Sequence, residues 1–420
     1  MRATSQSATS QSATSQSATS QLPKEYNDFL EDFAEEYLKI IYENKGGNIF
    51  DNQDKIIEQG KIFSNVIVKD FTTPDYLTIA NLQKNVWQFS CAKNYQELKD
   101  LSLALVDDNG KIRSFSDFVE KATKITVKQN GWLQTEYNQA IIGAESASRW
   151  SEMENDNAVV NLIYRTVGDS YVRDEHQLLD GVVRPKNDAW WNINYPPNGW
   201  GCRCAAEADF FSQITPTNQL PNVTIPPMFR QNLAKAGLIF PKGHPYFKDI
   251  PRKELDLALK YIPIENAFYK QKLKDGDTVI GKILISAMVD KKELIKGIDA
   301  SKIFLKHQKD AKIELLPKIE VQKNTKERDI EFRKKTFGEE YLKKFPLKNP
   351  DLRLNGEFAD FKIVSGSYSS VQKAIKDGKK QAKIILIKVP NESNFDYIIQ
   401  AVNGQFNKFE NTTDLVMQNK

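Results

Sequence analysis

The chain contains few cysteines and few histidines, three of each among 420 residues. This sparse, odd number of cysteines argues against the disulfide framework of small secreted folds. The sequence also lacks a run of about 18 apolar residues, the length that a transmembrane helix needs, and its N-terminus lacks the apolar segment of a secretory signal. From these absences we expect a soluble protein that is synthesised in a cytoplasm and makes no contact with a membrane.

The length and the hydrophobic content of the chain allow two or three domains. Hydrophobic residues make up 40% of the 420 residues, enough for substantial cores. Residues 301–420 carry 24 Lys and Arg against 16 Asp and Glu, whereas residues 1–300 carry 35 against 39. A basic C-terminal part on a mildly acidic body is typical of a region that binds nucleic acid, and equally of a solvated lysine-rich surface.

The first 150 residues show two patterns. Residues 1–21 repeat Ala-Thr-Ser-Gln-Ser, a polar low-complexity tract that predicts a disordered tail. After it, hydrophobic residues recur every three or four positions, and Ser114 precedes one such run as a helix N-cap. Residues 133–150 predict a long helix with small residues on one face, where another element packs closely. This region is therefore expected to be mainly helical.

The composition changes at residue 159 toward Tyr, Trp, Val and turn pairs, which predicts short strands and fixed loops. The motifs "YRTVGDSYVRDEHQLLDG" and "PPNGWGCRC" follow in this order, with an aromatic pair between them. Over roughly residues 60–210 this order resembles the phage Mu F-like minor head proteins, the phage head morphogenesis domain. The resemblance implies a minor capsid protein of a phage or prophage, located in the head interior, whose partners are portal, scaffold or major capsid protein.

One histidine and two cysteines of this region could meet in space. His176 lies 26 residues before Cys202, and Cys204 follows after one residue. These residues are zinc ligands by type, with Asp180 as a candidate fourth ligand, or they form a buried hydrogen-bonded group that stabilises a loop-rich fold. Paired zinc ligands are normally separated by two residues, so the spacing favours the second interpretation. No nucleophile stands with a base here, and we predict no catalysis in this domain.

The sequence thus predicts a multidomain α+β protein with a mainly helical N-terminal region, a compact loop-rich core and a small C-terminal α+β domain. Its parts are expected at residues 1–21 (tail), 22–212 (Mu F-like domain), 213–250 (proline-rich linker or arm along a neighbour), 251–299 (connecting segment) and 300–420 (nuclease-like domain).

Asn355-Gly356 in the last part is the strongest hairpin signal of the chain. A two-residue turn there pairs Leu352 with Ala359 and would place Asp351 opposite Asp360. Because side chains alternate along a strand, Lys362 would share a face with Asp360. Two acids and a lysine on one patch form either a metal-binding nuclease centre or an ion-pair cluster. The string from Pro350-Asp351 to Asp360-x-Lys362 resembles the PD-(D/E)XK nuclease signature, in which carboxylates hold a divalent cation and the lysine supports the attacking water.

The whole segment 300–420 is also similar to the C-terminal toxin domains of contact-dependent inhibition proteins, of the barnase, EndoU, colicin and RelE-like RNases. That resemblance implies cleavage of RNA, such as tRNA, without metal, and an immunity protein as partner. The candidate catalytic residues, which would act as acid and base and stabilise the developing charge, are Asp360, Lys362, Asp351, Lys380 and Lys388. We favour the metal-free RNase. The alternatives are a metal-dependent nuclease and an inactive module that only binds, for example, packaged DNA.

Overall fold

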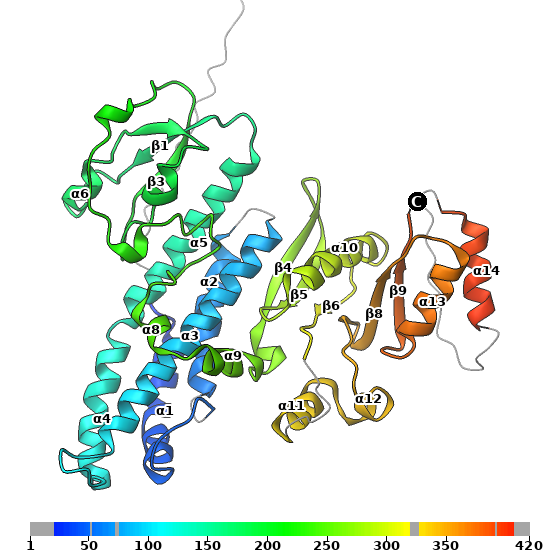
Figure 1. Cartoon of the computed structure of the whole chain (residues 1–420), viewed down its shortest axis with the longest axis horizontal. Coiled ribbons are helices and arrows are strands. Elements are labelled where there is room, and N and C mark those ends of the chain that lie inside the picture. The colour runs from blue at the N-terminus through cyan, green and yellow to red at the C-terminus, as the bar shows by residue number, and fades with distance from the viewer. Residues whose placement is uncertain (1–20, 51–52, 72–74, 320–326, 391–392, 407–420) are drawn as a thin grey trace, which may run out of the picture.

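The computed structural model describes residues 21–50, 53–71, 75–319, 327–390 and 393–406. The tail predicted at residues 1–21 lies, apart from Gln21, outside the described residues. Figure 1 shows a bundle of long helices with a small sheet at one end, and a larger sheet with its own helices beside the bundle. The predicted multidomain α+β fold is confirmed.

The N-terminal region is helical, as its periodicity predicts. Aromatic rings stack along the first helix from Tyr26 through Phe29 and Phe33 to Tyr37. The Ser114 hydroxyl accepts a hydrogen bond from the Asp117 amide and caps its helix as expected. The long helices are α1 (Lys24–Glu43), α2 (Gln53–Asp70), α3 (Tyr76–Ala104), α4 (Phe115–Asn130) and α5 (Leu133–Asn155).

A small antiparallel sheet of order β2-β1-β3 follows α5. Its loops are fixed by buried aromatic side chains, among them Trp191 and Tyr195, and the Tyr195 ring meets Trp150 of α5 edge-on. The predicted short strands and fixed loops are therefore present. The elements are β1 (Asn161–Arg165), α6 (Asp174–Gln177), β2 (Val183–Pro185), α7 (Trp191–Asn194) and β3 (Ala205–Asp209).

The proline-rich segment that follows packs along the bundle of the same chain. The Phe240 ring stacks on Phe89 of α3 with ring centroids 3.6 Å apart. A side chain at Gly143 of α5 would lie 2.9 Å from the Ile239 side chain, so the small residues of α5 admit this segment. Its short elements are η1 (Thr217–Gln219), η2 (Pro227–Phe229) and α8 (Pro245–Asp249).

The larger sheet has six strands in the order β4-β5-β6-β7-β8-β9. The pairs β5–β6 and β8–β9 are parallel and the others antiparallel. Because β4 and β5 belong to this sheet, it crosses the boundary predicted at residue 300. The elements are α9 (Arg252–Lys260), η3 (Ile264–Ala267), β4 (Phe268–Asp275), β5 (Thr278–Ser286), α10 (Lys291–His307), β6 (Ile313–Leu315), α11 (Glu327–Phe337), α12 (Glu339–Lys344), β7 (Leu352–Leu354), β8 (Glu357–Ile363), α13 (Tyr368–Gly378), β9 (Ile384–Lys388) and α14 (Phe395–Phe406).

None of the helices in the described ranges is both long enough and apolar enough to cross a membrane.

The hairpin β7–β8 has the register that the sequence predicts. Leu352 pairs with Ala359, and the turn residues Asn355 and Gly356 have φ values of 49° and 90°. The regular ladder ends at this pair, so Asp351 and Asp360 are not a ladder pair. The Asp351 carboxylate instead accepts a hydrogen bond from the Phe361 amide at 2.9 Å.

Candidate functional site

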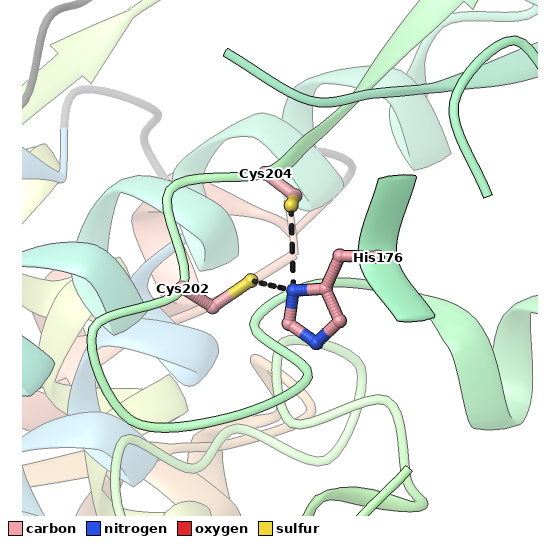
Figure 2. A group of neighbouring side chains, drawn as sticks. All are labelled: His176, Cys202 and Cys204. Carbon is pink, nitrogen blue, oxygen red and sulfur yellow. Dashed lines mark hydrogen bonds between the residues drawn. The ribbon is translucent and has the colours of Figure 1, made fainter. Parts of the chain in front are cut away.

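The first candidate site lies in the Mu F-like part and joins helix α6 to the loop before β3. His176 belongs to α6, while Cys202 and Cys204 lie in the loop that leads into β3. Figure 2 shows both sulfur atoms directed at the same ring nitrogen of the histidine. The Nδ1 atom lies 3.6 Å from the Cys202 sulfur and 3.7 Å from the Cys204 sulfur. All three ligand atoms lie within 4.8 Å of one another and all three residues are buried.

The two thiols shift the pKa values of each other in opposite directions. The hydrogen bond from Cys204 lowers the pKa of Cys202, and His176 lowers it further, while burial opposes both. The same contact with Cys202 raises the pKa of Cys204, and burial raises it too. A negative charge is thus favoured on the Cys202 sulfur, and a second negative charge, on the Cys204 sulfur, is strongly disfavoured.

The charged neighbours of this site form their hydrogen bonds elsewhere. Asp180, the candidate fourth ligand, accepts hydrogen bonds from the amide and the hydroxyl of Thr166 and is not part of the group. Arg203 binds Asp169 through two hydrogen bonds of 2.6 Å. The Arg173 guanidinium donates to the Trp200 carbonyl. The three donor atoms therefore face one another without a carboxylate or a guanidinium among them.

The second candidate site is centred on the hairpin β7–β8. Asp360 is fully buried, and its two carboxylate oxygens lie 3.0 and 2.7 Å from the Lys362 amine. The Asp351 carboxyl group is in hydrogen-bonding contact with that of Asp360. The structure thus brings together the three residues that the string from Asp351 to Lys362 singled out.

Burial is the main reason why the pKa of Asp351 is raised to about 6, and the neighbouring Asp360 raises it further. Lys318 partly offsets this effect, because its amine lies 3.9 Å from Asp351. The same amine lies 2.8 Å from Glu293 of α10. A third amine, that of Lys296, lies 3.4 Å from Glu293, so the three acids of this cluster face three lysines.

The other two predicted catalytic lysines lie in separate ion pairs. Lys380 pairs with Asp377 at 3.2 Å, and Lys388 pairs with Asp299 of α10 at 3.5 Å. Both pairs are largely exposed to solvent. These contacts are the ordinary surface pairs of a lysine-rich face.

Two groups of residues were not predicted from the sequence: Glu293 and Lys318 beside the hairpin, and two buried ion pairs in the helical bundle. Glu293 and Lys318 are remote in sequence from the hairpin and meet it only in the fold. In the bundle, Lys93 binds Glu136 and Lys55 binds Glu97, each across two helices. The apolar periodicity of α3 gave no indication that Lys93 is buried.

Comparison with known proteins gives a family match that covers the first site. Residues 99–207 match the family model described as Phage Mu protein F like protein. The chain carries a phage Mu F-like domain. The matched range holds His176, Cys202 and Cys204, and it is narrower than the range of about 60–210 over which the sequence shows its resemblance.

Two curated proteins share part of this domain. The Mu-like prophage FluMu F protein of Haemophilus influenzae is 41% identical over 68 residues, which are 16% of this chain and 16% of that protein. Protein F of Escherichia phage Mu, whose name assigns it to capsid assembly, is 38% identical over 77 residues, 18% of each chain. The alignments thus span less than a fifth of these relatives. No solved structure matches the chain.

Proposed function

We propose that this protein is a minor head protein of a phage or prophage that takes part in head assembly through its Mu F-like domain. The observation that carries the proposal is the family match over residues 99–207. The printed name of the phage Mu relative supports an assembly role. The partners would be portal, scaffold or major capsid protein, and the location the interior of the head.

Exposed apolar side chains on the small domain support a protein partner. Phe211 is 95% exposed and Tyr171 is 85% exposed. Large apolar side chains that remain exposed to solvent are typical of a contact surface when they form a patch. The other members of this exposed set are Leu178, Phe210 and Ile214.

Co-assembly tests this function. The full chain is expressed with the portal, scaffold and major capsid proteins of the same phage or prophage, and procapsids are purified and probed for the chain. We expect incorporation in few copies, and its loss for Phe211→Asp. Leu347→Asp is the control, because Leu347 is 65% exposed but lies beyond the Mu F-like domain. Procapsids that contain the wild-type chain no more often than an unrelated protein would contradict the proposal.

A second function is supported by the cluster around Asp360. We propose that the sheet region is a divalent-cation-dependent nuclease, in which Asp351 and Asp360 hold the cation and Lys362 supports the attacking water. The supporting observation is that the buried Asp360 carboxylate lies beside the half-buried Asp351 carboxyl group, with the Lys362 amine next to it. Lys380 and Lys388 are engaged elsewhere, so the geometry supports this alternative better than the metal-free RNase that the sequence favours.

Cleavage assays with the full chain distinguish these activities. We expect cleavage of tRNA or single-stranded DNA with magnesium, none with chelator, and at least a hundredfold loss for Asp360→Asn. Asp299→Asn, which removes an exposed acid of the same region, is expected to keep full activity. Cleavage of RNA alone in chelator, lost in Lys362→Ala, would replace this proposal with the metal-free RNase. If both metal conditions leave every substrate intact and the chain is harmless in cells, the region is a binding module.

A further inference from the structure

We propose that His176, Cys202 and Cys204 bind one zinc ion, which makes the Mu F-like domain of this chain a metalloprotein domain. The proposal rests on the arrangement of the three side chains and does not depend on either proposed function. It also reverses the preference for a hydrogen-bonded group that the spacing of the cysteines suggests.

The distances between the donor atoms are those of a tetrahedral zinc site. Zinc–sulfur bonds of about 2.3 Å and zinc–nitrogen bonds of about 2.0–2.1 Å at tetrahedral angles place nitrogen and sulfur about 3.6 Å apart. The observed Nδ1 to sulfur distances are 3.6 Å and 3.7 Å. Both nitrogen–sulfur distances thus agree with a shared zinc ion, and the three donor atoms lie within 4.8 Å of one another.

A hydrogen-bonded group explains the same geometry poorly. A ring nitrogen has either one proton or one lone pair, so Nδ1 can form a good hydrogen bond with only one of the two sulfurs. Both sulfurs are nevertheless directed at it (Figure 2). A divalent cation satisfies all three donors together and stabilises both sulfurs as thiolates, including the second negative charge that the buried site otherwise disfavours.

The single residue between the cysteines is compatible with this site. Side chains two positions apart on an extended chain point to the same side, and the one between them points to the other. Cys202 and Cys204 accordingly meet His176, while Arg203 reaches outward to Asp169. The chain runs directly from this point into β3, which fixes the two cysteines relative to the sheet.

The surroundings of the sulfurs support bound thiolates. The Asn198 amide donates a hydrogen bond to the Cys202 sulfur, and the Tyr164 hydroxyl contacts the Cys204 sulfur. Tyr164 is in turn held by the Asn198 side chain at 2.9 Å. Such outer contacts orient the ligands of a metal. Three protein ligands leave the fourth position of a tetrahedral ion to water.

Metal analysis of the purified full chain tests the proposal. We expect close to one zinc per chain in the wild type, and less than about a tenth of that in Cys202→Ser combined with Cys204→Ser. Cys91→Ser and Asp180→Asn are the controls and should keep the metal, because Cys91 is buried in α3 and Asp180 is bound to Thr166. A wild type without zinc, even after incubation with excess zinc, overturns the proposal, and so does a double variant that keeps it.

A second measurement covers the case in which the double variant does not fold. Cobalt is exchanged into the wild-type chain, and the cobalt–thiolate absorption in the near ultraviolet is recorded. We expect a tetrahedral cobalt spectrum with this band, and a strongly reduced band in the single variant Cys204→Ser. Cobalt that binds without a thiolate band would overturn the assignment to the cysteines.

Discussion

The helical bundle and the larger sheet bury charged groups in different ways. In the bundle, Lys93 meets Glu136 and Lys55 meets Glu97, and every one of these side chains is at most 7% exposed. At the hairpin, the acids Asp351 and Asp360 touch each other, and their lysine neighbours reach solvent, with 28% of the Lys362 side chain exposed.

The buried charges of the bundle therefore have a structural role, whereas the arrangement at the hairpin suits the binding of a ligand. A closed pair of one acid and one base is balanced and has no reason to bind an ion. Two adjacent carboxylates beside lysines that reach solvent form an open cluster, which is accessible to a cation. The Cys202 site is a third case, in which soft donors are buried without any hydrogen-bonded cationic side chain.

The largest effect is expected where a balanced pair is broken. Lys93→Met leaves the Glu136 carboxylate buried without its counter-charge, and this should cost about 3–5 kcal/mol of the free energy of unfolding. Burial already lowers the pKa of Lys93 and raises that of Glu136. All six tryptophans lie between residues 87 and 200, so urea unfolding followed by tryptophan fluorescence reports on this half of the chain.

Two controls belong to this measurement. The double change Lys93→Met with Glu136→Leu removes both charges and should recover most of the loss. Lys124→Ala breaks an exposed pair with Glu120 on α4 and should leave the unfolding midpoint unchanged. If Lys93→Met unfolds at the wild-type urea concentration, the contrast between closed and open charge clusters does not hold.

The second effect concerns the Cys202 site. If zinc binds there, its removal by a strong chelator should lower the free energy of unfolding by about 3 kcal/mol, the value expected for a ligand at roughly a hundred times its Kd. The loss should be visible in tryptophan fluorescence, and added zinc should reverse it. A chelated protein that unfolds at the same midpoint as the untreated one would show that the ion adds nothing to stability.

Local sequence patterns predicted those features that depend on neighbouring residues. The register of β7–β8 follows from the Asn355-Gly356 turn, and the N-cap at Ser114 and the mainly helical character of the first 150 residues follow from spacing. The approach of Asp351 to Asp360 and Lys362 followed from the same turn. Within a hairpin, pairing and side-chain direction are fixed by a few adjacent residues.

Contacts between remote segments could not be predicted in this way. The pairing of β5 with β6 extends the larger sheet across residue 300, and Lys318 reaches Glu293 from another element. The burial of Lys93 depends on Glu136 being brought opposite by helix packing. Each of these contacts is decided by tertiary packing, which overrides local propensity.

The third effect is a dependence of stability on pH in the segment that packs on the bundle. Burial lowers the pKa of His244 to about 4, from an ordinary value of 6.5, and Lys93 adds to this. The unfolded chain then binds a proton at higher pH than the folded chain does. Stability is therefore complete above pH 6.5 and falls as the pH drops toward 4, by on the order of 2 kcal/mol.

His244→Asn tests this dependence. The His244 side chain accepts a hydrogen bond from the Tyr246 amide at the start of α8, a role that asparagine can keep without titrating. The variant should lose most of the decline in unfolding midpoint between pH 6.5 and 4, read from Trp200, whose ring lies 5.5 Å from that of His244. An unchanged decline would assign the pH dependence to other groups.

The smallest expected effect is the loss of stability when the turn of the hairpin is changed and its charged residues are kept. Gly356 has a φ of 90° and nothing within 4 Å of an added side chain, so Gly356→Ala meets backbone strain and no steric clash. The expected cost is about 1 kcal/mol, and Gly356→Asn should cost less because asparagine tolerates this region. Hydrogen exchange of the β7–β8 amides measures the loss locally.

Since the register is also held by Asn355, whose amide and side chain both form hydrogen bonds with the Lys312 backbone, the Asp351–Asp360 contact should survive the change. Cation-dependent cleavage should then persist in Gly356→Ala and vanish in Asp360→Asn, which separates the stability of the hairpin from the chemistry of its acids.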